Sequence, residues 1–294
     1  MKNAVAVATF VDNNRFLIEE FSWLYKSWIY SGSYRYSDLV AFCHPAARDK
    51  LVQDSNLTYV PMMPLSGVEA EWMNYPFINS VHFLTTQSAA FIEKYDYVLR
   101  TDNDTFLTHN FVGLRPRLAL FGMGAYVRDE NADRKLPEVA KRLKLNYCYI
   151  HNVGSTIFYK TKRVITYSRH QLALCKVIKE TEFKHTVGEW PGWFSGTLTM
   201  YAGELAANDI FDYGISLGGL DCMSMSGDGI GSNDYHIHAY HTDQYFSKLK
   251  WREGSYKDIE RAKLDVGKIN DYCMFIVMTP VEEVAEVVGY EIGT

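Results

Sequence analysis

Two carboxylates one residue apart, Asp102 and Asp104, stand directly after the apolar run Tyr97-Val98-Leu99. The composition of that run is typical of a buried strand, and a strand that ends here can direct both carboxylates toward one cleft. Mg²⁺ and Mn²⁺ prefer oxygen ligands and leave coordination positions open for substrate phosphates. The motif therefore predicts a site for a divalent cation and a nucleoside diphosphate. An acidic pair of this kind can also be no more than a solvated strand end.

Three histidines late in the chain, His236, His238 and His241, offer further metal ligands. Strand alternation places His236 and His238 on one face, with His241 beyond them near the strand end. The same spacing is typical of metallohydrolases, in which imidazoles bind zinc and a metal-bound water is the nucleophile. Two features depart from that class: Tyr240 stands where the metallo-β-lactamase pattern has Asp, and the cluster comes late in the chain. A metallohydrolase therefore stays the alternative interpretation, behind the metal and diphosphate site.

The elements that must position these residues alternate in the first half of the chain. Apolar runs predict strands over 4–10, 38–43, 57–62 and 97–99, and helical spacing predicts helices over 16–29 and 77–95. This order predicts an α/β fold with a parallel sheet covered on both faces. Ligands of such sheets bind beyond the carboxyl ends of the strands. Thr9, Phe10 and the acidic motif all stand at such ends, so we expect them to be neighbours.

The second half of the chain is less regular. We predict a strand over 155–159, helices over 163–182 and 197–208, the second capped by Ser195, and a strand over 235–240. The glycine-rich segment 226–233 is predicted to be a mobile loop, because a strand rather than a helix follows it. The mixed charges of 128–144 indicate a solvated face or an exposed helix. The valines of 279–294 indicate a helix that docks on the domain.

Composition excludes several classes of protein. The net charge of -5 and the pI near 6.0 argue against a nucleic-acid partner, which selects for clustered Lys and Arg. The five cysteines show no zinc-like spacing, which favours a reduced, cytoplasmic location. The chain begins with a short apolar run unlike a signal peptide, and no run approaches the roughly 20 apolar residues of a membrane span.

The segment Val98-Leu99-Arg100-Thr101-Asp102-Asn103-Asp104 resembles the DxD motif of nucleotide-sugar-dependent glycosyltransferases of the GT-A fold. The resemblance covers most of the chain. It includes the strand and helix order before the motif, the segment Asn152-Val153-Gly154-Ser155, an aromatic glycine-rich loop before a helix, and the late histidines. It implies a Rossmann-like, mostly parallel central sheet with helices on both faces. It also implies one domain, 1–294, with a nucleotide-sugar-binding half, 1–110, and an acceptor-binding half, 111–294, that carries a C-terminal metal ligand.

The resemblance also implies roles for individual residues. Asp104 would bind the metal and so help the leaving group depart, and Asp102 would bind the metal, the ribose or the sugar. His241 is the preferred third ligand and His238 its competitor. A nearby Lys that contacts the diphosphate is also implied, and Lys248 matches it. Thr9 and Phe10, at the end of the first strand, would hold the base and ribose. Arg15 would either reach the phosphates or be a solvated residue at the start of a helix.

The activity that the resemblance implies is transfer of a sugar from a nucleoside diphosphate donor, expected to be UDP-linked, to a glycan or other hydroxyl acceptor, with Mn²⁺ or Mg²⁺. In the family, the acidic residue that serves as the general base stands at the start of the helix after the aromatic loop. This chain has Thr197-Leu198-Thr199 there. Glu189 is the nearest candidate base, Asp209 and Asp221 are others, and the stereochemistry stays open. Trp190 and Trp193, with Phe194, would form either an acceptor-sugar platform or core packing. A non-catalytic nucleotide- or sugar-binding module is a further alternative.

Overall fold

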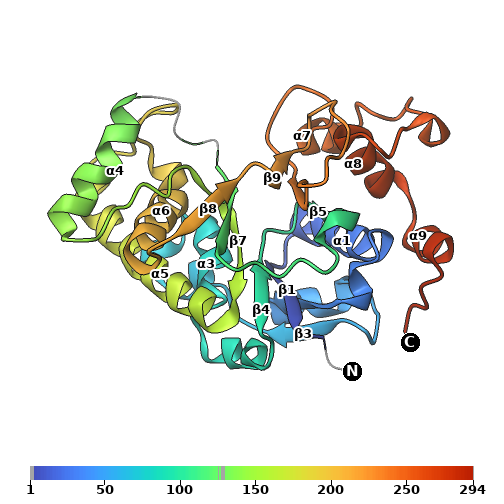
Figure 1. Ribbon diagram of the computed structural model, residues 1–294, viewed down its shortest axis with the longest axis horizontal. Helices are drawn as coiled ribbons and strands as arrows, with labels where there is room; N and C mark the ends of the chain where they lie inside the picture. The colour runs from blue at the N-terminus through green and yellow to red at the C-terminus, as the bar shows by residue number, and fades with distance from the viewer. Residues whose placement is uncertain (1–2, 125, 127–129, 294) are drawn as a thin grey trace.

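The computed structural model describes residues 3–124, 126 and 130–293, and its central element is a seven-stranded sheet of order β3-β2-β1-β4-β7-β6-β8 (Figure 1). Strand β7 runs antiparallel to both of its neighbours, and the other paired strands are parallel. The predicted α/β class with a mostly parallel sheet is therefore confirmed. The strands are β1 (Val5–Val11), β2 (Ser37–Cys43), β3 (Thr58–Pro61), β4 (Tyr97–Arg100), β6 (Ala119–Met123), β7 (Val153–Lys160) and β8 (Gly214–Leu217).

Helices cover both faces of this sheet because its strands are apolar on both sides. Side chains of β1 alternate between two hydrophobic clusters, so that Val5 and Val7 lie in one and Ala6 and Ala8 in the other. Helix α1 (Arg15–Tyr30) supplies Phe21 to the first cluster, and the side chain of Asn14 caps its first turn. Helices α5 (Thr161–Glu182) and α6 (Leu198–Ile210) pack against the second.

A second, three-stranded sheet continues from the end of β4. Its order is β5-β10-β9, with β5 at Thr105–Leu107, β10 at His236–His238 and β9 at Leu220–Met223. A third cluster joins this sheet to helix α8 (Ile269–Met278) and to Trp23 of α1, which stacks 6.0 Å from Phe106. The residues between β4 and β5 therefore connect the two sheets, and they are the acidic motif.

The helix predicted over 77–95 is wrong. The structure has a 3₁₀ turn at Pro76–Ile78, the single turn α3 (Asn79–His82) and a 3₁₀ stretch at Gln87–Lys94. Between them, the hydroxyls of Thr85 and Thr86 donate to the carbonyls of His82 and Phe83, at 2.8 and 3.2 Å. Such side-chain bonds offer the backbone an alternative to a continuous helix. The apolar spacing of this segment reflects burial of Ile78, Val81, Ala89 and Ile92 from separate turns.

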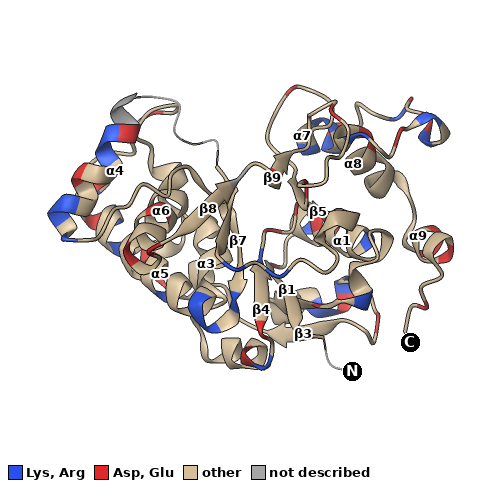
Figure 2. Ribbon diagram, viewed as in Figure 1, with Lys and Arg blue, Asp and Glu red and all other residues tan. Residues whose placement is uncertain are grey.

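Several other elements complete the fold. The mixed-charge segment forms α4 (Glu130–Leu143), which carries both signs of charge at one end of the molecule (Figure 2). Segment 226–233 leads into β10 and not into a helix, as predicted. The cap predicted at Ser195 is wrong, because α6 begins after a 3₁₀ turn at Ser195–Thr197 and has no side-chain cap. The short helix α2 (Leu65–Val68) follows β3, and the short helix α7 (Lys248–Arg252) follows β10 and the loop of His241.

All five cysteines are free thiols: Cys43, Cys148, Cys175, Cys222 and Cys273. Among the described residues, no helix combines the length and apolar character that a bilayer crossing requires.

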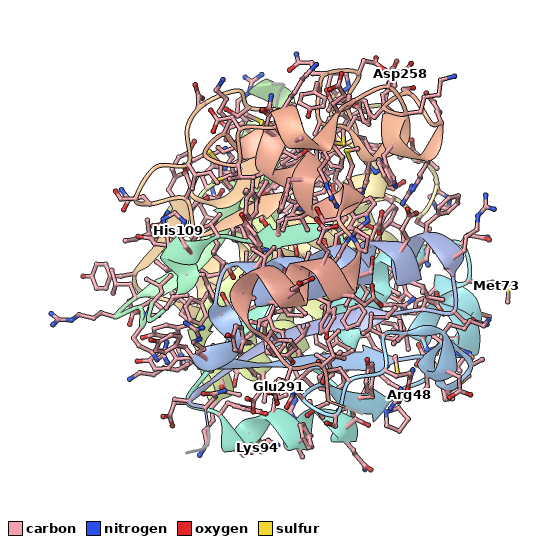
Figure 3. All side chains as sticks on the ribbon, turned by 90° about the vertical axis from the view of Figure 1, so that its right-hand side faces the viewer. Arg48, Met73, Lys94, His109, Asp258 and Glu291 are labelled. Carbon is pink, nitrogen blue, oxygen red and sulfur yellow. The ribbon has the colours of Figure 1, made fainter. Side chains whose placement is uncertain are left out.

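The C-terminal segment docks as predicted. Helix α9 (Val281–Val288) lies against α1 through its buried Val284, and Figure 3 shows Glu291 beyond it, beside the N-terminal part of the chain. The tail is held by Asp54, which accepts hydrogen bonds from the hydroxyls of Tyr25 and Tyr290, both at 2.7 Å, and from the Gly293 amide at 3.0 Å. Burial alone would raise the pKa of Asp54, but these donors lower it below its usual value.

We predict that Asp54→Ala lowers the free energy of unfolding by about 2–4 kcal/mol, because several donors lose a charged acceptor. Since the folded-state pKa is depressed, this stabilisation is present above the unfolded pKa near 3.8 and is lost as the pH falls through the lower folded value. Urea unfolding of both proteins between pH 7 and 3 measures it. Asp49→Ala, at an exposed position nearby, is the control. Equal stability of Asp54→Ala and the control at pH 7 would contradict this role.

Candidate functional site

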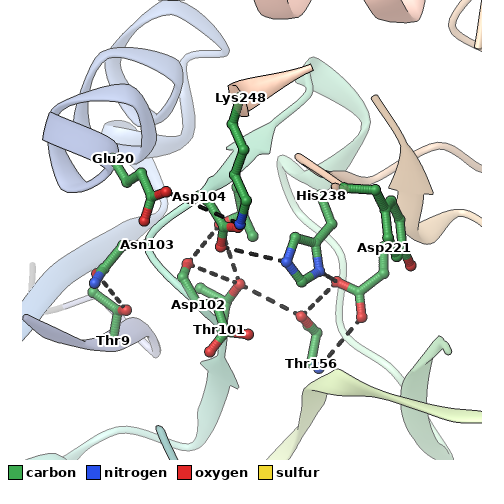
Figure 4. Close-up of polar contacts among 12 residues, drawn as sticks. Thr9, Glu20, Thr101, Asp102, Asn103, Asp104, Thr156, Asp221, His238 and Lys248 are labelled. Atoms are coloured by element: carbon green, nitrogen blue, oxygen red, sulfur yellow. Dashed lines mark hydrogen bonds and ion pairs between the residues drawn. The ribbon is translucent and has the colours of Figure 1, made fainter. Parts of the chain in front are cut away.

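The acidic motif is fixed by its middle residue. The Thr9 hydroxyl donates to Asn103 Oδ1 at 2.8 Å, and Asn103 Nδ2 donates to the Phe10 carbonyl at 2.7 Å. The motif and the end of β1 are thus neighbours, as predicted. Thr9 is fully buried and Phe10 nearly so, so in the structure both hold the motif in place. With Asn103 bound to β1, the flanking carboxylates of Asp102 and Asp104 are left for other partners (Figure 4).

Strand pairing brings a histidine to these carboxylates. Strand β10 pairs antiparallel with β5, and its register places His238 opposite Thr105, the residue after Asp104. The His238 Nε2 atom lies 3.3 Å from Asp104 Oδ1. One ligand atom each from Asp102, Asp104 and His238 can be chosen so that all lie within 4.8 Å of one another. Two carboxylates and one imidazole therefore converge at the junction of the two sheets.

The preferred third ligand, His241, is not part of this cluster, and its competitor His238 takes that place. Strand β10 ends at His238, and His241 lies three residues later on an exposed loop. The HxHxxH arrangement of a metallohydrolase is not assembled either. His236 is completely buried, and its Nε2 atom lies 2.7 Å from the Thr101 hydroxyl. Sequence spacing alone could not show where β10 would end, because the strand is limited by its pairing with β5.

A buried carboxylate stands behind the imidazole of His238. This carboxylate is Asp221, whose Oδ1 atom lies 3.6 Å from His238 Nδ1. The same oxygen accepts a hydrogen bond from the Thr156 hydroxyl at 2.6 Å. Asp221 was a candidate base, but its side chain is only 1% exposed, which rules out direct contact with an acceptor. Carboxylates in this position fix the orientation of a metal-binding imidazole. Asp221 therefore positions His238 so that Nε2 faces the acidic motif.

Two glycines make room for Asp221. A Cβ on Gly122 would lie 1.8 Å from Asp221 Oδ2, and a Cβ on Gly154 would lie 2.5 Å from the same atom. Both distances are shorter than any side chain permits, so only glycine lets the backbone of β6 and β7 approach this carboxylate. The Gly154 of the segment Asn152-Val153-Gly154-Ser155 thus has a physical reason in the site.

A second set of charges lies on the other side of Asp104. The Lys248 ammonium, at the start of α7, pairs with Asp104 Oδ2 and lies 4.0 Å from Glu20 Oε1. Arg252 also pairs with Glu20, whose side chain is 3% exposed. Glu20 was not among the residues predicted for the site. The available signal was a carboxylate directly before the apolar Phe21 in the helix predicted over 16–29.

The charges in this site shift one another's pKa values. Burial alone would raise the pKa of Asp104, but Lys248 and His238 hold it well below its usual range. Burial alone would lower the pKa of His238, and Asp104 and Asp221 raise it well above the usual value. For Glu20, burial and then the charge of Asp104 raise the pKa to about 7. Asp104 is therefore ionised near neutral pH and available as a ligand.

The donor set fits a divalent cation. Carboxylate oxygens and one imidazole nitrogen are ligands that Mn²⁺ accepts, and three protein ligands leave positions for substrate oxygens. Burial raises the pKa of Asp102, as does the charge of Asp104, despite the opposing effect of His238. A cation between these two carboxylates would relieve that repulsion.

The structure places the other predicted residues as follows. Arg15 is exposed at the start of α1, with its guanidinium 4.5 Å from the centre of the Phe16 ring. Glu189 is exposed in the loop between α5 and α6, and Trp190 is 45% exposed in the same loop. Trp193 stacks on Tyr201 at 4.2 Å, so core packing occupies it. The candidate base Asp209 lies 2.9 Å from His170 Nε2.

Comparisons with known proteins give three findings. The sequence matches the family described as "Domain of unknown function (DUF7164)" over residues 1–279. A solved structure of the galactosyltransferase LgtC in complex with donor and acceptor sugar analogues is similar to 74% of this chain, over 75% of its own length, with a TM-score of 0.47 and 11% sequence identity. No curated protein sequence matches.

We predict that His238→Ala weakens Mn²⁺ binding by at least about tenfold, because a ligand of the cluster is lost. The matched control is His241→Ala, at the exposed position three residues later, which should change the affinity less than threefold. Isothermal titration with Mn²⁺ alone measures both. The opposite order of the two effects would show that His241 is the ligand.

Gly154→Ala should also weaken Mn²⁺ binding, by about tenfold, because the added methyl displaces Asp221 and releases His238. Gly227→Ala is the control, since the nearest atom to its Cβ would be 3.8 Å away. The same titration, combined with thermal unfolding to confirm folding, distinguishes the two. A folded Gly154→Ala protein with unchanged affinity would contradict the positioning role of Asp221.

Proposed function

The chain belongs to the family described as "Domain of unknown function (DUF7164)", and we propose that it is a metal-dependent glycosyltransferase acting on a nucleoside diphosphate sugar. The observation that carries the proposal is the convergence of Asp102, Asp104 and His238 beside Lys248. This cluster lies beyond the carboxyl end of β4 in a mostly parallel sheet, where α/β proteins bind their ligands. The resemblance of residues 98–104 to a DxD motif supports the same reaction class.

The proposed donor side uses the charges of the cluster. When the bond between the anomeric carbon and the diphosphate breaks, negative charge collects on the leaving phosphate. A divalent cation on Asp102, Asp104 and His238, Mn²⁺ or Mg²⁺, would stabilise that charge. Lys248 binds a phosphate oxygen as a second, fixed positive charge.

Further residues set the geometry of the donor. Asn103 locks the motif to the end of β1 through Thr9 and Phe10, so that the carboxylates do not have to be ordered when the donor binds. We propose that the base and ribose, expected to be those of a uridine nucleotide, lie along this end of β1. Arg15, exposed at the start of α1, is the proposed additional phosphate contact.

The proposed acceptor side lies in the second half of the chain. Glu189 is the proposed base for a hydroxyl acceptor such as a glycan, because it is an exposed carboxylate in the loop before α6. Trp190 offers the open ring of that loop for stacking on the acceptor, while Trp193 is used in the core. In an inverting transferase a base takes the proton of the acceptor hydroxyl as it attacks, and full activity of Glu189→Gln would show that Glu189 is not that base.

The experiment incubates the protein with UDP-, GDP- and ADP-sugars, Mn²⁺ and a panel of sugar acceptors. We predict release of one nucleoside diphosphate, and at least about a hundredfold loss of this turnover in Asp104→Ala, because the leaving group loses its main electrostatic stabilisation. Asp243→Ala is the control, because Asp243 is an exposed carboxylate in the loop after His241.

A binding measurement accompanies the assay. Calorimetry should show Mn²⁺-dependent affinity for UDP or GDP that falls in Asp104→Ala. Nucleotide affinity without turnover in any combination would identify a binding module. No turnover, together with nucleotide affinity that is the same in wild type and Asp104→Ala, would contradict the proposed function altogether.

A further inference from the structure

The segment that leads into β7 has an unusual backbone. Lys144, Tyr149 and Asn152 have φ angles of 57°, 66° and 60°, in the left-handed region. A bulky aromatic residue rarely adopts this strained conformation, which persists only where surrounding contacts enforce it. The segment around Tyr149 must therefore be held from outside.

Helix α6 holds it. Asn208 accepts from the Ile150 amide at 2.8 Å and donates to the Ile150 carbonyl at 2.9 Å. One turn earlier, Glu204 accepts from the Asn152 amide at 2.8 Å and lies 2.9 Å from His151 Nδ1. Glu204 is completely buried, and the hydroxyls of Tyr126 and Tyr147 also donate to it. The whole segment is thus preorganised by two polar side chains on one face of α6.

The held segment displays an aromatic ring with a polar rim. Tyr149 is 58% exposed, and its ring stacks on the His151 ring at 5.1 Å with an interplanar angle of 28°. The Tyr149 hydroxyl donates to Asp133 Oδ1 at 3.3 Å, and His151 Nε2 lies 3.5 Å from the same oxygen. A ring face, a carboxylate and an imidazole therefore meet on the surface beside α4.

We propose that Tyr149, His151 and Asp133 form a subsite for a sugar ring of the acceptor, an inference that rests on the proposed function. The C–H face of a pyranose packs on an aromatic ring, and its hydroxyls donate to a carboxylate and bond with an imidazole. Contacts enforced at the expense of backbone strain are typical of binding loops. The subsite recognises a part of the acceptor other than the reacting hydroxyl.

The position of this subsite suits an acceptor. Tyr149 precedes Ser155 by six residues, so the two lie at most about 20 Å apart. Ser155 follows Gly154, which leaves the space for Asp221 behind His238. The subsite is therefore on the same stretch of chain as this part of the metal cluster. The same face of α6 also carries Tyr201, whose hydroxyl bonds to the Gly192 carbonyl and the Phe194 amide at 3.2 Å, in the loop of Glu189 and Trp190. One face of α6 thus holds both the segment around Tyr149 and the loop of Glu189 and Trp190.

The test compares Tyr149→Ala with Tyr213→Ala, which removes a 77% exposed tyrosine elsewhere in the same half. With an oligosaccharide acceptor, Tyr149→Ala should raise the acceptor KM by about tenfold or more, with kcat and the donor KM unchanged. Tyr213→Ala should leave all three unchanged. A purely structural role for Tyr149 would lower the thermal stability or kcat instead, and equal acceptor KM values in both variants would overturn the proposal.

A binding experiment separates this proposal from the proposed function. Saturation-transfer NMR with lactose, maltotriose, cellotriose and chitotriose, without donor or metal, should show a bound saccharide in wild type and Tyr213→Ala and none in Tyr149→Ala. Binding that is lost in Tyr149→Ala, in a protein that turns over no nucleotide sugar, would support the subsite while the transferase proposal fails. No saccharide bound by wild type, or binding retained in Tyr149→Ala, would overturn the subsite whether or not nucleotide sugars are turned over.

Discussion

The antiparallel pairing of β10 with β5 is the constraint on which the candidate site depends. Strand β5 follows the acidic motif directly, so its register with β10 decides which histidine meets Asp104. Asn103 sets the other coordinate by its bonds to the end of β1. The motif is therefore held between the two sheets at its middle and at its end. The pairing of β5 with β10 and the side-chain amide of Asn103 thus fix the geometry of the cluster.

That charge must be balanced, because the site is largely removed from water. Asp104 stands between the ammonium of Lys248 and the imidazole of His238, and both lower its pKa. Asp221 in turn supports His238 from behind, and two glycines leave space for it. A buried charge without a partner costs several kcal/mol, so each of these groups requires the next. The elements that supply Lys248, His238 and Asp221, which are α7, β10 and β9, are consequently held together around the motif.

The sequence predicted much of this arrangement where short-range patterns decide the structure. Strands β1 to β4 and helix α1 lie within a few residues of their predicted ranges, and Thr9 and Phe10 meet the acidic motif as expected. Strands β5 and β6 were not predicted. The structure groups His238, and not the preferred His241, with the two carboxylates. No local pattern could show this, because the end of β10 depends on pairing with β5, a strand from a distant part of the chain. Glu20 and the hold of α6 on Tyr149 were missed for the same reason, since each depends on contacts between distant segments. The continuous helix over 77–95 failed because threonine hydroxyls competed for its carbonyls.

If Asp102, Asp104 and His238 hold one divalent cation that also binds a nucleoside diphosphate, pulsed electron paramagnetic resonance of the Mn²⁺ protein with UDP will show it. An imidazole nitrogen bound to the ion and the phosphorus of a phosphate whose oxygen is bound to it give separate couplings. We predict a coupling to one imidazole nitrogen, absent in His238→Ala, together with a phosphorus coupling that appears on adding UDP. A Mn²⁺ spectrum without imidazole coupling, or one whose coupling persists in His238→Ala and disappears in His241→Ala, would contradict it.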